Sequence, residues 1–248
     1  MAPSIRIAIV ECDNPGFGSI NKRGNYGGIF SSLLKAAAPG AGLAQEDLVF
    51  SVFNVVENTT NYPRLEDIDG VLFTGSKYNA YDDNAWTNKL VDFTREILKQ
   101  DRVRIIGVCY GHQIVGRALG VKCAPSDRGW ELSVSEVNLT EDGKKIFQKD
   151  KLKIMQMHKD IVYDYPPLVE KLGSSPICTV QGMHIPRKLI TVQGHPEFNE
   201  EIMTEILKGR HATGLFDDTL YQDALARASE PQDGLHIAAA FLRFMKDR

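Results

Sequence analysis

The sequence predicts an α/β protein with one domain, in which a mixed, mostly parallel central sheet carries helices on both faces. Apolar runs and helical stretches alternate from residue 5 to residue 120, which favours parallel strands joined by helices. Residues 121–139 switch to the alternating pattern of antiparallel strands. Within the first part, a Gly-x-Cys-x-Gly sequence at residues 107–111 marks a sharp strand-to-helix turn. We expect a single domain over residues 1–248, closed by a helical segment at 200–248.

Composition places the chain among ordinary globular proteins, with 43% hydrophobic and 25% charged residues. The formal net charge of −3 gives no reason to expect a nucleic acid or an anionic membrane as partner. No apolar run reaches transmembrane length, and the N-terminus reads as a first strand and not as a signal peptide, so we expect a cytoplasmic protein. The cysteines lack zinc spacing and make a disulfide framework unexpected; they are Cys12, Cys109, Cys123 and Cys178.

The first half of the chain contains the elements of a parallel sheet. Residues 103–108 form an apolar run broken only by Arg104 and Gly107, which is typical of a buried strand, and a helical pattern begins at Ile114. Residues 11–28 are rich in Asn, Gly and Pro but fit neither glycine pattern of a phosphate loop, so we expect a mobile loop on the substrate side. The other expected elements are strands at 5–10, 48–55 and 68–74 and helices at 29–38 and 86–99.

The second half predicts antiparallel strands followed by helices. Residues 121–124 and 131–139 have strand patterns, and Thr140 is suited to cap a short helix at 141–148. Further strands are expected at 152–157, 177–181 and 189–192, and helices at 200–211, 217–228 and 236–246.

Cys109 lies at the apex of the predicted strand-to-helix turn. Gly107 and Gly111 flank it, because larger side chains would collide with the strand and the helix. Such a turn presents its apex side chain in a strained, exposed position. The following helix places backbone N–H groups beside the sulfur, where they favour a thiolate and can hold an oxyanion. The alternative is a buried structural cysteine, and the turn alone does not decide between the two.

His195 is the candidate general base among the six histidines. It directly follows a predicted strand, and in an extended segment Glu197 faces the same side and can orient the imidazole ring. His112 lies inside the helix after Cys109, where it points away from the thiol as easily as toward it. The chain order of nucleophile, histidine and acid differs from that of ordinary α/β-hydrolases.

Two motifs together resemble the class I glutamine amidotransferases, and in particular members related to the glutaminase domain of GMP synthase. They are Gly107-Val108-Cys109-Tyr110-Gly111-His112-Gln113 and Gly194-His195-Pro196-Glu197-Phe198. The resemblance implies that Cys109 attacks the γ-carbonyl of a glutamyl amide and forms a thioester. It further implies that His195 transfers the protons and that Glu197 orients His195.

The resemblance also implies an oxyanion hole and a substrate pocket. Backbone N–H groups of Tyr110 and of Gly75-Ser76 would hold the oxyanion, although Thr-Gly-Ser-Lys departs here from the usual Gly-Gly-Pro type. Gln113 would line the pocket or simply pack the helix. His158-x-Asp160 matches a motif of the GMP synthase type, which implies that His158 lies near the substrate but outside the triad; a structural role explains His158 equally well. Backbone groups at Trp130-Glu131-Leu132-Ser133 would hold the two ends of the glutamyl group. No cluster has metal-ligand spacing, and the mechanism needs no cofactor.

Three functions remain open at this point. The first is a hydrolase of γ-glutamyl amide bonds, acting on glutamine or on γ-glutamyl peptides such as glutathione and its conjugates. Its support is that residues after 200 hold only helices and no synthetase, and that residues 11–28 and 78–86 can accept a large leaving group. The second is a glutaminase subunit that delivers ammonia to a separate synthetase partner. The third, a binding or regulatory module, is disfavoured by the presence of Cys109, His195 and Glu197 together.

Overall fold

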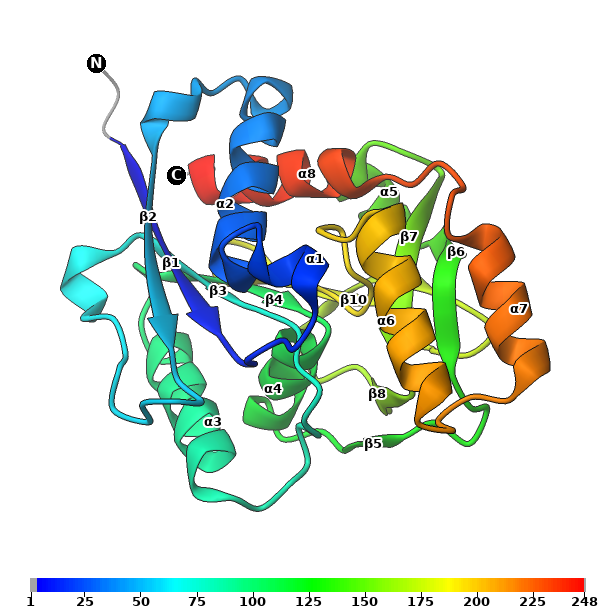
Figure 1. The fold of residues 1–248 in the computed structure, drawn as a ribbon. Coiled ribbons are helices and arrows are strands. Elements are labelled where there is room, and N and C mark those ends of the chain that lie inside the picture. Colours follow the sequence, from blue (N-terminus) through cyan, green and yellow to red (C-terminus); the bar gives the residue numbers. More distant parts are fainter. Residues whose placement is uncertain (1–3, 248) are drawn as a thin grey trace.

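A nine-stranded sheet forms the centre of the molecule and carries helices on both faces (Figure 1). The computed structural model describes residues 4–247. The strand order is β2-β1-β3-β4-β11-β10-β9-β6-β7, and β5 pairs with β8 in a separate small sheet. The first five strands of this order run parallel, and each later pair is antiparallel. The predicted mixed sheet is confirmed.

The strands fall into a parallel and an antiparallel half of the large sheet. The parallel strands are β1 (Ile5–Glu11), β2 (Leu48–Asn54), β3 (Gly70–Phe73), β4 (Arg104–Val108) and β11 (Leu189–Val192). The antiparallel strands are β6 (Glu131–Leu139), β7 (Lys151–His158), β9 (Glu170–Ser174) and β10 (Gly182–Ile185), and the small sheet holds β5 (Cys123–Pro125) and β8 (Asp160–Val162).

Helices pack on both faces because each presents one apolar side to the sheet. On one face Phe30 and Phe241 belong to a single core cluster that also includes residues of β6; on the other, Leu90 and Ile114 belong to a second cluster. The first face carries α2 (Asn25–Ala37), α5 (Glu141–Phe147), α6 (Glu200–Ala212), α7 (Asp218–Arg227) and α8 (Gly234–Lys246). The second carries α3 (Ala85–Leu98) and α4 (Tyr110–Ala118) (Figure 1).

The segment at residues 11–28 is more ordered than the predicted loop. It contains α1 (Gly18–Asn21), and α2 begins at Asn25, four residues before the expected helix start. Its glycines permit close packing: a Cβ atom at Gly28 would lie 1.9 Å from the carbonyl oxygen of Arg23. The prediction of an irregular loop was wrong because glycine here serves close approach and not flexibility.

The strand expected at 177–181 is absent, and its apolar residues are buried without strand pairing. Cys178 and Val180 are fully buried, but the backbone turns here, since the Ser175 N–H donates to the Cys178 carbonyl at 2.8 Å. The strands lie on either side of this turn, as β9 and β10. Burial alone therefore mimicked a strand pattern. Within residues 4–247, no helix is both long and apolar enough to cross a membrane.

Close packing around the turn at Cys109 generates a stability prediction. A Cβ atom at Gly111 would lie 2.4 Å from the carbonyl oxygen of Phe73, which is backbone and cannot move aside easily. We expect Gly111→Ala to lower the free energy of unfolding by about 2–3 kcal/mol, measured by urea denaturation. Gly16→Ala is the control, because no atom lies within 4 Å of the added carbon; a similar loss in both variants would contradict the packing argument.

Candidate active site

Cys109 sits between β4 and α4 in a conformation that non-glycine residues rarely adopt, with φ 51° and ψ −102°. Its N–H donates to the Val192 carbonyl at 3.0 Å, and the Gly111 N–H donates to the Thr74 carbonyl at 3.1 Å. The predicted strain is present, but the predicted exposure is wrong, since Cys109 is 5% exposed. The turn after β3 and the segment after β11 cover the apex: a Cβ atom at Gly75 would lie 3.7 Å from the Cys109 Cβ.

His195 and Glu197 form the contact that their spacing predicts. The His195 Nδ1 donates to Glu197 Oε1 at 2.8 Å, and both side chains are buried. The Phe198 ring stacks on the imidazole, with centroids 4.1 Å apart. The backbone N–H of His195 donates to the Met155 carbonyl at 2.7 Å, which ties this segment to β7. Ring, backbone and acid together fix the orientation of the imidazole.

The electrostatics favour a protonated His195 beside Cys109. Burial lowers the pKa of His195, but the charges of Cys109 and Glu197 and the hydrogen bonds to both outweigh it and raise that pKa to about 10. His112 differs, since burial lowers its pKa to about 3 and its Nδ1 lies 2.8 Å from Thr191 Oγ1. His195 can therefore form an imidazolium partner for a thiolate, whereas His112 stays neutral and structural.

Backbone donors are available near Cys109. The N–H groups of Tyr110, Gly75 and Ser76 donate to no acceptor within residues 4–247, while that of Gly111 is occupied by Thr74. Gly75 is buried and next to His195, since a Cβ atom there would lie 2.6 Å from His195 Cε1. These free donors are of the kind that stabilises an oxyanion. Tyr110 turns its ring toward α3, where it stacks with Trp86 at 5.6 Å.

Gln113 is buried and occupied by structural hydrogen bonds. Its Nε2 donates to the Asp160 carbonyl at 2.8 Å and to Gln193 Oε1 at 3.2 Å. These contacts join α4 to β8 and to the residue before Gly194. They favour the packing interpretation of Gln113 over direct substrate contact, because both amide hydrogens have acceptors.

Residues 130–133 include a strained position inside β6. Ser133 has φ 62° and is fully buried, and its Oγ has no hydrogen-bond partner within residues 4–247. The Leu132 carbonyl accepts a hydrogen bond from Arg227 Nη1 at 2.9 Å. Trp130 packs against Phe216, with ring centroids 5.1 Å apart. A strained backbone and an unpartnered hydroxyl are often found where a ligand binds.

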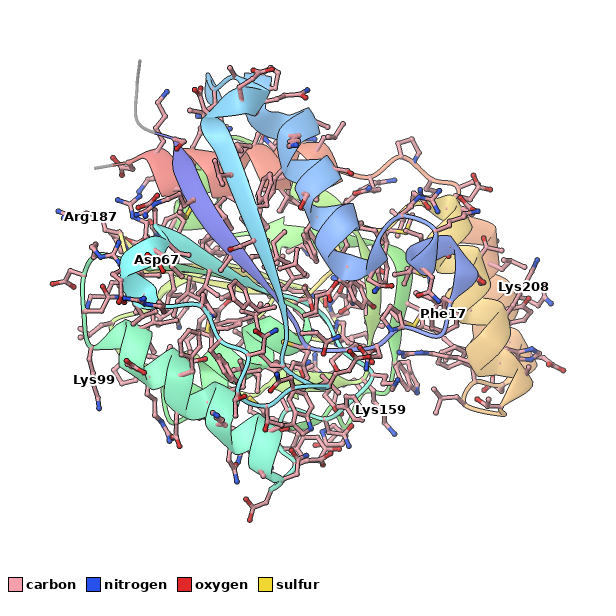
Figure 2. All side chains as sticks on the ribbon, turned by 60° about the vertical axis from the view of Figure 1, so that its left-hand side comes forward. Phe17, Asp67, Lys99, Lys159, Arg187 and Lys208 are labelled. Atoms are coloured by element: carbon pink, nitrogen blue, oxygen red, sulfur yellow. The ribbon has the colours of Figure 1, made fainter. Side chains whose placement is uncertain are left out.

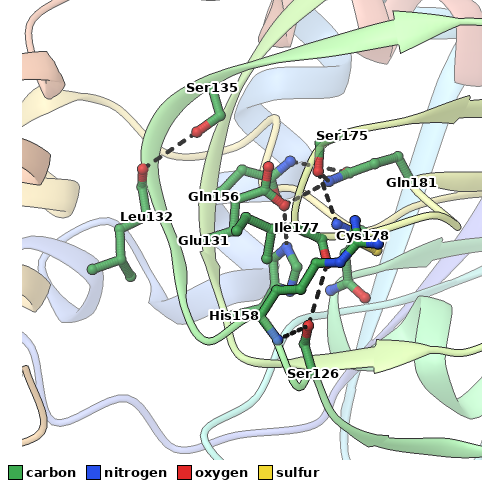
Figure 3. A network of polar contacts seen from close by, with 12 residues as sticks. Ser126, Glu131, Leu132, Ser135, Gln156, His158, Ser175, Ile177, Cys178 and Gln181 are labelled. Atoms are coloured by element: carbon green, nitrogen blue, oxygen red, sulfur yellow. Dashed lines mark hydrogen bonds and ion pairs between the residues drawn. The ribbon is translucent and has the colours of Figure 1, made fainter. Parts of the chain in front are cut away.

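The side chains of Glu131 and His158 contact each other inside a buried network (Figure 3). The His158 Nε2 lies 3.1 Å from Glu131 Oε2, and Gln181 Nε2 donates to the same oxygen at 2.7 Å. Gln156 Nε2 in turn donates to Gln181 Oε1 at 2.9 Å. This geometry favours the structural alternative for His158. A buried carboxylate with two such partners rigidifies the strands that carry it.

Sequence reasoning missed Arg210 and Asp13, which no motif marks. Both charges act on the Tyr26 phenol. Burial raises the pKa of this phenol, the charge of Asp13 raises it further, and the charge of Arg210 lowers it. The charges of Glu197 and Cys109 also act on Tyr26. These groups come from distant parts of the chain, since Asp13 follows β1, Tyr26 lies in α2 and Arg210 lies in α6. Within residues 4–247, no three His, Cys, Asp or Glu side chains are grouped to hold a metal ion.

Comparisons with known proteins identify relatives over nearly the whole chain. The family model described as glutamine amidotransferase class-I matches residues 47–210. A glutamine amidotransferase-like protein of Schizosaccharomyces pombe is 35% identical over 96% of this chain and 98% of its own length. Gamma-glutamyl peptidase 2 of Arabidopsis thaliana is 27% identical over 90% of each chain. The crystal structure of a glutamine amidotransferase from Thermotoga maritima superimposes with a TM-score of 0.74 at 18% identity, covering 98% of this chain and 99% of that one.

The raised pKa of His195 generates a prediction for its titration. We expect the ring to remain an imidazolium through neutral pH and to lose its proton only near pH 10. In Cys109→Ala the pKa should fall, because burial then acts against fewer opposing charges. NMR of protein labelled with ¹⁵N-histidine measures both curves. Cys178→Ala removes another buried thiol and should leave the curve unchanged; an unaltered curve in Cys109→Ala would contradict the ion pair.

Proposed function

The chain belongs to the class I glutamine amidotransferase family, and from this premise we propose that it hydrolyses γ-glutamyl amide bonds with Cys109 as nucleophile. The observation that carries the proposal is the buried His195–Glu197 hydrogen bond of 2.8 Å beside the strained turn at Cys109. A nucleophile, a general base and an acid that orients the base are the groups that covalent amide hydrolysis needs. No metal or cofactor takes part in this mechanism.

The first half-reaction forms a thioester. The Cys109 sulfur attacks the γ-carbonyl carbon, a C–S bond forms, and the carbonyl oxygen becomes an oxyanion held by the N–H groups of Tyr110 and of the Gly75-Ser76 turn. When the C–N bond breaks, His195 gives its proton to the leaving amine. The raised pKa of His195 keeps that proton available at neutral pH.

The second half-reaction releases glutamate. A water molecule attacks the thioester carbonyl while His195 accepts one of its protons, and the C–S bond breaks as the sulfur leaves as a thiolate. Glu197 holds the imidazole in one tautomer throughout both steps through the Nδ1 hydrogen bond. The site is thereby returned to its starting state.

Two substrate classes compete under this mechanism. We place γ-glutamyl peptides such as glutathione and its conjugates first, because a relative that carries the name gamma-glutamyl peptidase aligns over 90% of the chain. The alternative is a glutaminase subunit that passes ammonia to a synthetase partner, in keeping with the family name. A binding or regulatory module is the least supported, since it would not need the His195–Glu197 contact beside a strained cysteine.

The direct test is glutamate release from glutathione and from glutamine, offered separately to the purified protein. We expect turnover of glutathione to exceed that of glutamine, and Cys109→Ala to lose at least about 10⁴-fold in kcat because the covalent step is gone. Cys178→Ala should retain activity, which excludes a general effect of losing a buried thiol. Full activity of Cys109→Ala would refute the mechanism. Preference for glutamine, or stimulation by cell extract, would favour the ammonia-donating subunit.

A second prediction concerns the glycine that faces His195. Gly75→Ala places a methyl group 2.6 Å from His195 Cε1, so the imidazole must move from its position beside Cys109. We expect kcat, measured on variant protein that is folded by circular dichroism, to fall about 10²-fold, because a displacement of about 1 Å is enough for such a loss. Gly16→Ala is the matched control with open space around the added carbon. Equal kcat in the wild type and Gly75→Ala would show that Gly75 does not position His195.

A further inference from the structure

We propose that Arg210 binds a carboxylate group of the substrate and thereby selects γ-glutamyl substrates with a carboxylate that can reach its guanidinium group. The inference rests on the proposed function, because it names the substrate class of the same site. It assigns a recognition role to a residue of α6, outside the two sequence motifs.

Arg210 lacks the carboxylate partners that Arg6 and Arg227 possess. Arg6 pairs with Asp69 at 2.8 Å, and Arg227 pairs with Asp223 at 2.6 Å. The guanidinium of Arg210 donates no hydrogen bond and forms no ion pair within residues 4–247, although it is only partly exposed. Its contact is with the Trp130 ring, whose centroid lies 5.8 Å from the guanidinium carbon. A partly buried cation with five free N–H donors is costly unless an anion meets it.

The free guanidinium lies near the nucleophile. Burial lowers the pKa of Arg210, and the charges of Tyr26, Cys109 and Asp13 act in the opposite direction, so these groups lie within electrostatic range of the guanidinium. Asp13 is already engaged, because its Oδ1 lies 3.1 Å from Lys77 Nζ and its Oδ2 accepts the Lys77 N–H at 3.0 Å. An anion for Arg210 must therefore come from outside these residues.

Neighbouring contacts hold Arg210 in place. A Cβ atom at Gly209 would lie 3.0 Å from the Phe17 ring, so the segment around Phe17 packs directly on α6 (Figure 2). The Glu205 carboxylate accepts the N–H groups of Gly18 and Ser19 at 3.0 and 2.8 Å. Glu201, one turn earlier, pairs with Lys22 and Arg23. The end of α6 is thus fixed against residues 17–23, and the Trp130 ring lies next to the guanidinium.

The chemistry of the guanidinium identifies the ligand group. Its planar fork matches a carboxylate with two parallel hydrogen bonds, and stacking on an aromatic ring preserves that geometry. A γ-glutamyl peptide offers two carboxylates, one on the glutamyl α-carbon and one at the end of the leaving peptide. The two sources share the same recognition chemistry, and substrates that lack one of them separate the two.

The test compares wild type, Arg210→Met and Arg210→Lys on three substrates. These are glutathione, its glycyl ethyl ester and γ-glutamyl-p-nitroanilide, of which the last two have no free carboxylate on the leaving group. We expect Arg210→Met to raise KM for glutathione about 10–100-fold with little change in kcat, because a charge-assisted, bidentate contact is lost. Arg210→Lys should restore part of the affinity because it keeps the charge.

The pattern across substrates identifies the carboxylate. A rise in KM confined to glutathione assigns Arg210 to the leaving peptide, and an equal rise for all three assigns it to the glutamyl α-carboxylate. Arg187→Met is the matched control, since Arg187 is exposed on the side of the molecule away from Phe17 and Lys208 (Figure 2). Unchanged KM for all substrates, or a loss of kcat alone, would overturn the inference.

Binding separates this inference from the proposed function. Calorimetric titration of Cys109→Ala with glutathione, with and without Arg210→Met, needs no turnover. If the wild type hydrolyses nothing but binding is present and lost with Arg210→Met, the inference stands and the proposed function fails. If Cys109→Ala binds no glutathione, or binds it equally well with Arg210→Met, the inference fails whatever the activity. Thermal denaturation shows that the variants are folded, and Arg210→Lys provides the second variant should Arg210→Met not fold.

Discussion

The strained backbone at Cys109 is the constraint on which the rest of the site depends. Two hydrogen bonds to the strands that flank β4 hold Cys109 at its φ of 51°. The Cys109 N–H donates to the Val192 carbonyl at the end of β11, and the Gly111 N–H donates to the Thr74 carbonyl just after β3. The same two strands continue directly into Gly75 and His195. One pair of backbone contacts therefore fixes Cys109, Gly75 and His195 in relation to each other. Strain of this kind persists only where the surrounding structure over-determines it.

The antiparallel half of the sheet supports this arrangement from behind. The His195 N–H donates to the Met155 carbonyl of β7. The next residue, Gln156, donates to Gln181, which in turn donates to Glu131. Most polar atoms of this network have partners, so it resists rearrangement in a low-dielectric interior. These contacts hold the His195 segment in position. Cys109 and His195 thus follow parallel strands, and the antiparallel strand β7 holds the segment of His195.

Prediction from sequence succeeded where local pattern decides structure. Glycines at 107 and 111, an apolar strand and the spacing of His195 and Glu197 each act over a few residues, and the turn and the contact are both present. It failed where tertiary packing decides. Gly28 belongs to a helix because the chain approaches itself closely there, and Cys178 is buried in a turn without strand pairing. The burial of Cys109 and the position of Arg210 depend on segments far away in sequence, which no local pattern reports.

The strand ends and helix α6 contribute different residues to this region of the molecule. Cys109 follows β4 and His195 follows β11, where a one-residue change would alter the geometry between them. Arg210 comes instead from α6 and Trp130 from the residue before β6, and their side chains contact each other. Under the proposed role of Arg210, a substitution in α6 would change which substrate is bound without moving Cys109, His195 or Glu197. Because the proposed binding contact and the proposed reacting groups stand on different elements, the proposed thioester chemistry would suit either a peptide or ammonia as leaving group, with α6 as the element that distinguishes them.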